Sequence, residues 1–164
     1  MNWSKVFMKL LKIILVILVS ITLMGCRKVT KSDNLTVTNI HNKVIKDKTT
    51  SKDLKELFGE PLRYIHDSEK TKELYAYWSN YEGGVNYSLE NNTDYWETIQ
   101  DAIKGNKYSY SDFDGYYEYS GKNLGIKSVY FIMINDKVFS FKFNGDIVDE
   151  SVAQKDKYLR QILD

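Results

Sequence analysis

Apolar residues recur with a helical period between Thr50 and Phe58. Leu54, Leu57 and Phe58 are spaced three and one apart, so they lie on one face of a short helix. Thr50 is a favourable first-turn cap, and Asp53 stands three residues later at the partner position of a capping box. The pattern predicts a helix that begins after Thr50 and buries Leu54 and Phe58.

The same stretch contains the signals that end this helix. Gly59 stands where a helix commonly finishes in a left-handed residue, and Pro61, the single proline of the chain, prevents continuation. After a polar loop, Leu74–Trp78 carries alternating aromatic residues, which predicts a strand. Upstream, Val37–Lys46 has apolar residues at positions that favour a helix, with a strand as the alternative because several are β-branched.

The last third of the chain alternates as strands do. Ile126–Ile134 is apolar on both faces and therefore predicts a central strand. Asn135-Asp136 would turn it into a strand at Lys137–Phe143. We further expect a second turn at Asn144-Gly145, a short edge strand at Ile147-Val148, and a C-terminal helix over Val152–Leu163 with Ser151 and Gln154 as a capping box.

The segment Glu82–Gly125 separates the predicted first strand from the others. Thr93–Lys104 is amphipathic and predicts a helix, while Lys107–Ser120 predicts a hairpin around Asp114-Gly115. In that hairpin Phe113 would pair with Tyr116, and alternation would place four tyrosines on one face: Tyr108, Tyr110, Tyr117 and Tyr119. This face is either core packed on Tyr95 and Trp96 or a binding surface, and we favour core because an isolated hairpin is unstable. Phe113 and Tyr116 at the tip are then the residues placed to contact a partner.

These elements predict an α+β fold. N-terminal helices pack on an antiparallel sheet as a small two-layer sandwich, with an α/β-hairpin insertion at 82–125 and a C-terminal helix. We expect this domain to occupy residues 37–164.

The N-terminus predicts export and lipidation. Three lysines precede an apolar run of about a dozen residues, which is shorter than the ~20 residues of a membrane-spanning helix. Leu23-Met24-Gly25-Cys26 closes the run and resembles the lipobox of bacterial lipoproteins. The resemblance implies cleavage of residues 1–25 as a signal peptide and acylation of Cys26; an uncleaved anchor is the alternative. Acyl chains would hold the protein on the lipid bilayer through Cys26, with residues 26–36 as a polar tether.

Composition narrows the classes of partner and chemistry. Cys26 is the only cysteine, so a lipidated chain has no thiol for a disulfide, zinc site or nucleophile. Removing residues 1–25 changes the formal net charge from +1 to −2, and a near-neutral chain is a poor ligand for nucleic acid. Nothing indicates a cofactor or a metal site, and the two histidines, His41 and His66, are expected to be ordinary surface residues. The sequence therefore favours a non-enzymatic protein.

One family resemblance covers about half of the mature chain. The pattern Thr50, Leu54, Phe58, Gly59-x-Pro61, an aromatic strand and a closing hairpin over Val138–Val148 is similar to that of the SmpA/OmlA (BamE-like) family of bacterial lipoproteins. The family has a short loop between its first two strands, where this chain has the 82–125 segment. The resemblance implies an envelope lipoprotein that binds a protein partner, as an accessory factor in outer-membrane protein assembly or envelope maintenance.

The location and the alternative function follow from the same reading. If the cell has an outer membrane, we expect its periplasmic face, because residue 27 is Arg and not the aspartate that retains enteric lipoproteins at the inner membrane. The alternative is an inhibitor or immunity-type lipoprotein that blocks an envelope hydrolase or toxin.

Overall fold

A four-stranded antiparallel sheet forms the centre of the protein. The computed structural model describes residues 31–99 and 108–163. The sheet has the order β1 (Arg63–Ile65), β2 (Gly115–Tyr119), β3 (Ile126–Ile134) and β4 (Lys137–Ile147). The helices are α2 (Val37–Lys43), α3 (Ser51–Phe58), α4 (Ser68–Asn80), α5 (Gly84–Asn92) and α6 (Glu150–Ala153), with 3₁₀ turns η1 (Lys31–Asn34), η2 (Tyr110–Asp112) and η3 (Leu159–Gln161). The predicted α+β class is confirmed.

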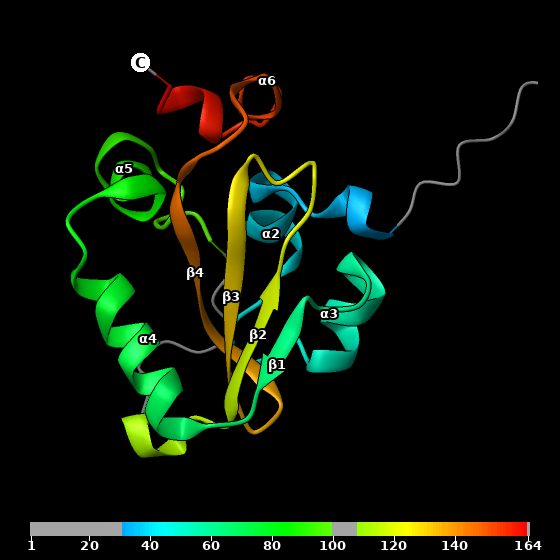
Figure 1. Cartoon of the computed structure of the whole chain (residues 1–164), viewed down its shortest axis with the longest axis vertical. Helices are drawn as coiled ribbons and strands as arrows, with labels where there is room; N and C mark the ends of the chain where they lie inside the picture. Colours follow the sequence, from blue (N-terminus) through cyan, green and yellow to red (C-terminus); the bar gives the residue numbers. More distant parts are fainter. Residues whose placement is uncertain (1–30, 100–107, 164) are drawn as a thin grey trace, which may run out of the picture.

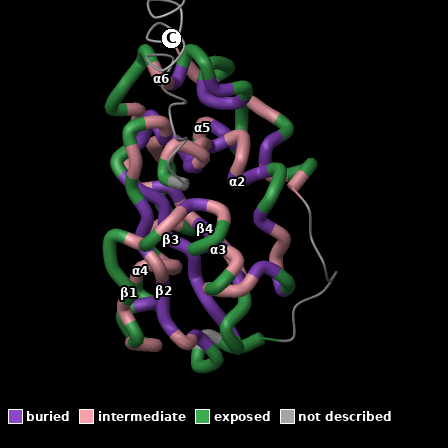
Figure 2. Tube along the Cα trace, turned by 90° about the vertical axis from the view of Figure 1, so that its right-hand side faces the viewer, coloured by how far each residue is buried: buried purple, intermediate pink, exposed green. Residues whose placement is uncertain are grey.

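Helices cover both faces of the sheet. Figure 1 shows α3 and α4 on opposite sides of the strands. The larger hydrophobic cluster joins alternate residues of β3 and β4 to α2, α3 and α5, whereas the smaller cluster joins the other residues of β3 to α4. Figure 2 shows the buried residues following the strands through the middle of the domain. The sheet is therefore the middle layer, and α4 adds a layer to the predicted two.

The predicted capped helix is confirmed as α3. Thr50 Oγ1 accepts a hydrogen bond from Asp53 N at 3.2 Å, and Asp53 Oδ2 accepts one from Thr50 N at 2.9 Å. The pKa of the Asp53 carboxyl is lowered, chiefly by the hydrogen bond from the Thr50 backbone N–H and next by the one from the Thr50 hydroxyl. Leu54 and Phe58 are fully buried, and Gly59 has the expected positive φ of 87°. The helix Val37–Lys43 confirms the preferred prediction for the preceding segment.

The predicted strand at Leu74–Trp78 is wrong, because these residues belong to α4. Asp67 caps this helix by accepting a hydrogen bond from Lys70 N at 3.0 Å. Thr71, Leu74, Tyr75 and Trp78 recur at helical spacing and pack toward the sheet. The alternating aromatic residues favoured a strand, but a helix lets this segment pack one face against the smaller cluster.

The first strand lies directly behind Gly59-x-Pro61, at Arg63–Ile65, where a polar loop was predicted. The segment inserted between the first two strands is therefore 66–114 and not 82–125. It supplies α4 and α5, and residues 115–119 form β2 inside the sheet. Much of the predicted insertion is thus part of the core.

The predicted hairpin around Asp114-Gly115 is also wrong. Gly115 begins β2, which pairs with both β1 and β3. A Cβ at Gly115 would lie 2.1 Å from the Ile65 carbonyl oxygen, so the glycine permits close approach of two strands rather than a turn. The Asn135-Asp136 turn is confirmed, and both residues have the positive φ of a tight hairpin turn.

Gly145 forms a bulge in place of the second turn. Strand β4 runs through Asn144 and Gly145 to Ile147, and the register shifts by one residue opposite β3 between Ile126 and Ser128. Gly145 has φ of 77°, the left-handed conformation that such a bulge needs. The separate edge strand at Ile147-Val148 therefore does not form.

The ends of the domain depart from the predicted boundaries. Leu35 is buried in the larger cluster, so the domain includes part of the predicted tether. The C-terminal helix breaks into α6 and η3, and Asp149, not Ser151, caps α6 by accepting from Val152 N at 3.2 Å. Residues 93–99 form turns and not a helix, and 100–104 lie outside the described residues.

Candidate functional site

The residues predicted to contact a partner are buried. Phe113 and Tyr116 expose only 4% and 8% of their surface and pack with Ile132 and Ile134 beneath α4. They do not form a hairpin tip, because β2 lies between two other strands. Cys26, the predicted lipidation site, lies outside the described residues.

The four tyrosines predicted to share a face have different surroundings. Tyr119 is buried in the larger cluster, and its burial raises the pKa of its hydroxyl. Tyr117 stacks on Tyr64 with ring centroids 4.2 Å apart. Tyr108 is exposed, and the side chain of Tyr110 is not described. The core interpretation holds for Tyr119 and in part for Tyr117.

Among the described residues, the polar partners of the two histidines are hydroxyl and amide groups. His41, predicted at the surface, is buried between Tyr95 and Tyr158, and its Nε2 lies 2.9 Å from Thr98 Oγ1 and 3.1 Å from Tyr158 Oη. Its partners are hydroxyl and amide groups and not carboxylates, so it holds the C-terminal segment on α2. His66 is exposed and contacts Tyr64 Oη at 2.8 Å. Within 31–99 and 108–163 no three His, Cys, Asp or Glu side chains gather as metal ligands would.

Three exposed tyrosines and one partly buried tryptophan at the junction of α4 and α5 form the main candidate site. We call Tyr77, Trp78, Tyr81 and Tyr87 the aromatic surface. Tyr77 and Tyr81 stack with centroids 5.7 Å apart at 17°, and Trp78 stands edge-on to both. Tyr77, Tyr81 and Tyr87 remain 58%, 43% and 44% exposed. Tyrosine and tryptophan rings gathered in this way are typical of binding surfaces, because they offer large rigid contact areas with polar tips.

A pocket of about 130 Å³ opens between these rings. We call it the Lys142 pocket; it is lined by Trp78, Ser79, Tyr81, Asn86, Tyr87, Glu90, Trp96 and Lys142. Lys142 projects from β4 and places its Nζ over the Trp96 ring, 5.6 Å from the centroid. Burial lowers the pKa of the Lys142 ammonium, and the nearby Glu90 opposes this shift. The pocket thus holds a partly desolvated cation among aromatic rings.

Asn86 fixes the floor of this pocket. Its Nδ2 donates to Phe143 O at 2.7 Å, and its Oδ1 accepts from Phe143 N at 2.9 Å. One side chain thereby satisfies both outward groups of an edge-strand residue and attaches α5 to β4. Trp96 Nε1 donates to the Asn86 carbonyl at 3.3 Å, which holds the second wall of the pocket in place.

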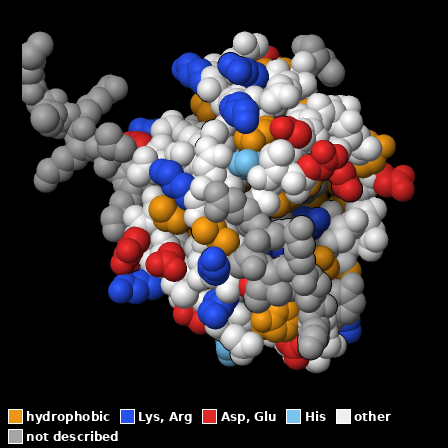
Figure 3. Space-filling model, turned by 180° about the vertical axis from the view of Figure 1, so that it is seen from behind, with side chains coloured by type: hydrophobic (Ala, Val, Ile, Leu, Met, Phe, Trp, Pro, Cys, Tyr) orange, Lys and Arg blue, Asp and Glu red, His pale blue; other side chains and the backbone are white. Residues whose placement is uncertain are grey.

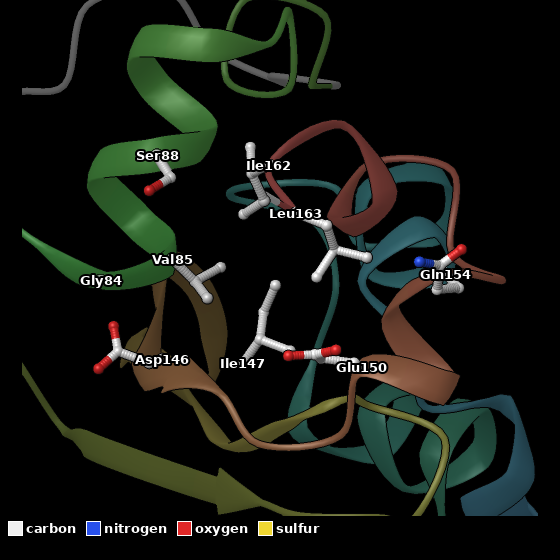
Figure 4. Close-up of a pocket in the computed structure, with 9 residues that line it drawn as sticks. All are labelled: Gly84, Val85, Ser88, Asp146, Ile147, Glu150, Gln154, Ile162 and Leu163. Carbon is white, nitrogen blue, oxygen red and sulfur yellow. The ribbon is translucent and has the colours of Figure 1, made fainter.

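A second and larger pocket lies near the C-terminus. Figure 4 shows Val85, Ile147, Ile162 and Leu163 directed into a space of about 310 Å³ between α5, the end of β4, α6 and the last turn. Ser88, Asp146, Glu150 and Gln154 supply its polar lining. The volume is at the lower limit for a small-molecule site. Its lining lacks a histidine, cysteine or lysine that could act with Ser88 in nucleophilic catalysis.

Charged side chains of both signs lie on the surface that Figure 3 shows. Several basic side chains gather at the top of this face and several acidic ones at its upper right, while both signs mix on the left, with apolar side chains between them. Such a distribution has no broad basic area that could follow a phosphate backbone.

Comparisons of the chain with protein-family models, curated proteins and solved structures found no match. Among the residues that the structure describes, no helix has both the length and the apolar character needed to cross a bilayer.

The sequence contained a signal for the aromatic surface. Tyr77 and Tyr81 are four residues apart, as are Leu74 and Trp78, which is the spacing of one helical side. The predicted strand at 74–78 was incompatible with this helical spacing, so the shared side of Tyr77 and Tyr81 was missed. Lys142 could not be identified in advance, because its pocket joins β4 to helices more than 50 residues upstream.

Proposed function

We propose that this protein is a non-enzymatic, membrane-anchored lipoprotein of the cell envelope that binds a protein partner through the aromatic surface. The observation that carries the proposal is the mutual contact of the rings at the C-terminal end of α4, beside the exposed Tyr87 of α5. Tyr77 and Tyr81 are held by each other and by Trp78, so little side-chain entropy is left to lose on binding. A pre-ordered exposed aromatic cluster of this kind is favourable for recognition and costly as bare surface.

Anchoring is the second part of the proposal and rests on the sequence. Cys26 follows the apolar run at the position a lipobox requires, and acylation there would tether the domain a few residues from the bilayer. Leu35, nine positions after Cys26, already belongs to the larger cluster, so the link between the core and Cys26 is short. The partner is then expected to be an envelope protein close to the same membrane.

The resemblance to the SmpA/OmlA family supports one specific form of this proposal. The capped helix, Gly59-x-Pro61 and the following strand stand in the expected order, although that strand is Arg63–Ile65. The partner in this form is a component of outer-membrane protein assembly. The surface differs from the one predicted, because α4 and α5 now carry the exposed rings.

Site-specific crosslinking tests the binding surface. A photoreactive residue placed at Tyr77 or Tyr87 in cells should capture a discrete partner. The matched control is Lys52, which is exposed on α3 on the other side of the sheet and should capture none. Capture from Lys52 alone would contradict the assignment.

The identity of the captured protein distinguishes the two candidate functions. Several subunits of an assembly machine would support an accessory role. A single hydrolase or toxin would instead identify an inhibitor or immunity-type lipoprotein.

Anchoring has a separate test. Labelled palmitate should mark the wild-type chain, and the Cys26→Ser variant should lose the label and accumulate as precursor. Equal labelling of the two chains would refute lipidation at Cys26.

A further inference from the structure

The Lys142 ammonium forms no direct ion pair with a described residue, although Glu90 lies nearby. Every ion pair among residues 31–99 and 108–163 involves other cations, and no described residue accepts a hydrogen bond from Lys142 Nζ. Its printed contacts are the faces of Trp96 and Tyr75, at 5.6 and 5.9 Å from the ring centroids. Ring faces stabilise the charge but accept none of its three N–H donors as an oxygen would.

We propose that the Lys142 pocket binds a carboxylate group, with Lys142 as its cationic partner and the aromatic surface as the contact for the atoms next to the carboxylate. A partly buried ammonium forms its strongest hydrogen bonds with an ionised oxygen, and such bonds are stronger where water is limited. The proposal deepens the proposed function and rests on it for the identity of the surface.

The charge around the pocket favours a monoanion over a dianion. Glu90 lines the same pocket, so Lys142 and Glu90 together carry no net charge. A bound carboxylate leaves the pocket with one net negative charge, whereas a phosphate dianion would leave two and would meet stronger repulsion from Glu90. The pocket has a single cationic side chain in its lining and no arginine, which also favours a small singly charged group.

The size of the pocket agrees with this assignment. About 130 Å³ accommodates a carboxylate and a few further atoms, and a larger ligand must extend over Tyr81 and Tyr87 at the rim. The carboxylate can belong to a free small acid or to an acidic side chain or C-terminus of a protein partner. Both sources offer the same group to Lys142.

Tryptophan fluorescence reports directly on this site. The chain has three tryptophans, and two of them, Trp78 and Trp96, line the Lys142 pocket. The third, Trp3, lies in the segment that processing before Cys26 would remove, and Trp3→Phe in the full chain leaves the two pocket residues as the only tryptophans whether or not the chain is processed. The experiment titrates this full-length variant in non-ionic detergent with sodium acetate, at constant ionic strength maintained with sodium chloride.

Acetate should change the fluorescence in a saturable way in the millimolar range, the affinity expected of one charge-assisted contact. Neutral acetamide, which has nearly the same shape, should not. N-acetylphenylalanine, which adds a ring beside the carboxylate, should bind more tightly than acetate. Inorganic phosphate should bind more weakly at a pH where it is a dianion.

Matched variants separate the pocket from general salt effects. Lys142→Met keeps the length of the side chain and should abolish the acetate response, whereas Lys137→Met, at an exposed position of the same strand, should leave it unchanged. Glu90→Gln removes the negative charge that competes with acetate for Lys142 and repels it. Acetate should therefore bind about threefold more tightly, the change expected when a partly screened repulsion between two carboxylates is lost.

Several results would overturn the proposal. Equal responses to acetate and acetamide, or a response retained in Lys142→Met while circular dichroism shows both chains folded, would exclude a carboxylate site. Weaker acetate binding in Glu90→Gln would show that Glu90 does not compete for Lys142.

The protein partner is tested separately. Crosslinking from Tyr77 that survives Lys142→Met, together with a lost acetate response, assigns the site to a small acid; loss of both assigns it to a carboxylate of the partner. A carboxylate response with no capture from Tyr77 or Tyr87 would support the pocket and contradict the proposed protein-binding function.

Discussion

Asn86 is expected to be one of the most sensitive polar residues of the domain. Its side chain makes two hydrogen bonds to the backbone of Phe143, at 2.7 and 2.9 Å, and both residues are buried. The Asn86→Ala change removes both bonds and leaves the N–H and C=O of Phe143 without these partners. Because each of the two buried polar groups left unsatisfied costs about 1–3 kcal/mol, the free energy of unfolding should fall by about 2–6 kcal/mol.

Urea unfolding of the full chain in non-ionic detergent, followed by circular dichroism, measures this loss. The midpoint should fall while the urea dependence stays constant, because the exposed area changes little. Asn86→Asp tests the donated hydrogen bond separately. An aspartate carboxylate can still accept from Phe143 N but repels Phe143 O. The loss in free energy of unfolding should therefore persist above the pKa of the carboxyl and diminish in acid, where the carboxyl can donate.

Asn91→Ala provides the matched control. Asn91 lies on the same helix and also donates to a backbone carbonyl, that of Tyr87, at 2.8 Å, but it is exposed. Water replaces its bond, so the loss should stay within about 0.5 kcal/mol. If Asn86→Ala lost no more than Asn91→Ala, the attachment of α5 to β4 through this side chain would be refuted.

Three further predictions concern the core and the helix cap. Phe58→Ala should lower the free energy of unfolding by about 3–5 kcal/mol, because a fully buried ring that stacks on Phe131 is lost; a loss below about 1 kcal/mol in urea unfolding would contradict that burial. Gly115→Ala should cost about 1–3 kcal/mol or more, because its Cβ would lie 2.1 Å from the Ile65 carbonyl oxygen. Gly121→Ala, where the nearest atom is 3.4 Å away, is the control, and equal losses in the two variants would show that β1 can move aside. Asp53 has a folded-state pKa below its ordinary value of 3.8, so its stabilisation is present above that value and is lost as pH falls through the folded-state pKa. Asp53→Asn should therefore lose less stability than wild type between about pH 5 and pH 2, and parallel pH profiles would contradict this linkage.

Local chemistry made several elements predictable. The helix at 51–58 follows from a capping threonine, an aspartate three residues on, two buried apolar positions and a glycine, all within ten residues. Ile126–Ile134 and Lys137–Phe143 follow from apolar runs on either side of a two-residue turn. In each case the decisive hydrogen bonds or contacts lie close in sequence, so residue order alone carries the information.

Errors arose where two local patterns competed. Residues 71–78 fit both a helical face and an aromatic strand, and the choice depended on whether a sheet face was available to receive Leu74, Tyr75 and Trp78. Asp114-Gly115 fits a hairpin turn, but Gly115 lies in the sheet, where its lack of a Cβ lets β1 approach closely. Asn144-Gly145 fits a turn, and the register with β3 makes it a bulge.

The sequence by itself therefore determined the α+β class, the capped helix, the two long strands and the hypothesis of a lipidated Cys26. Only the tertiary structure decided which aromatic side chains are exposed, because Phe113 and Tyr116 became core when β2 entered the sheet, and Tyr77 and Tyr81 remained outside when α4 covered it. The Lys142 pocket likewise depends on contacts between α4, α5 and β4. At these positions burial depends on which distant elements pack together, and the local spacing fitted more than one arrangement.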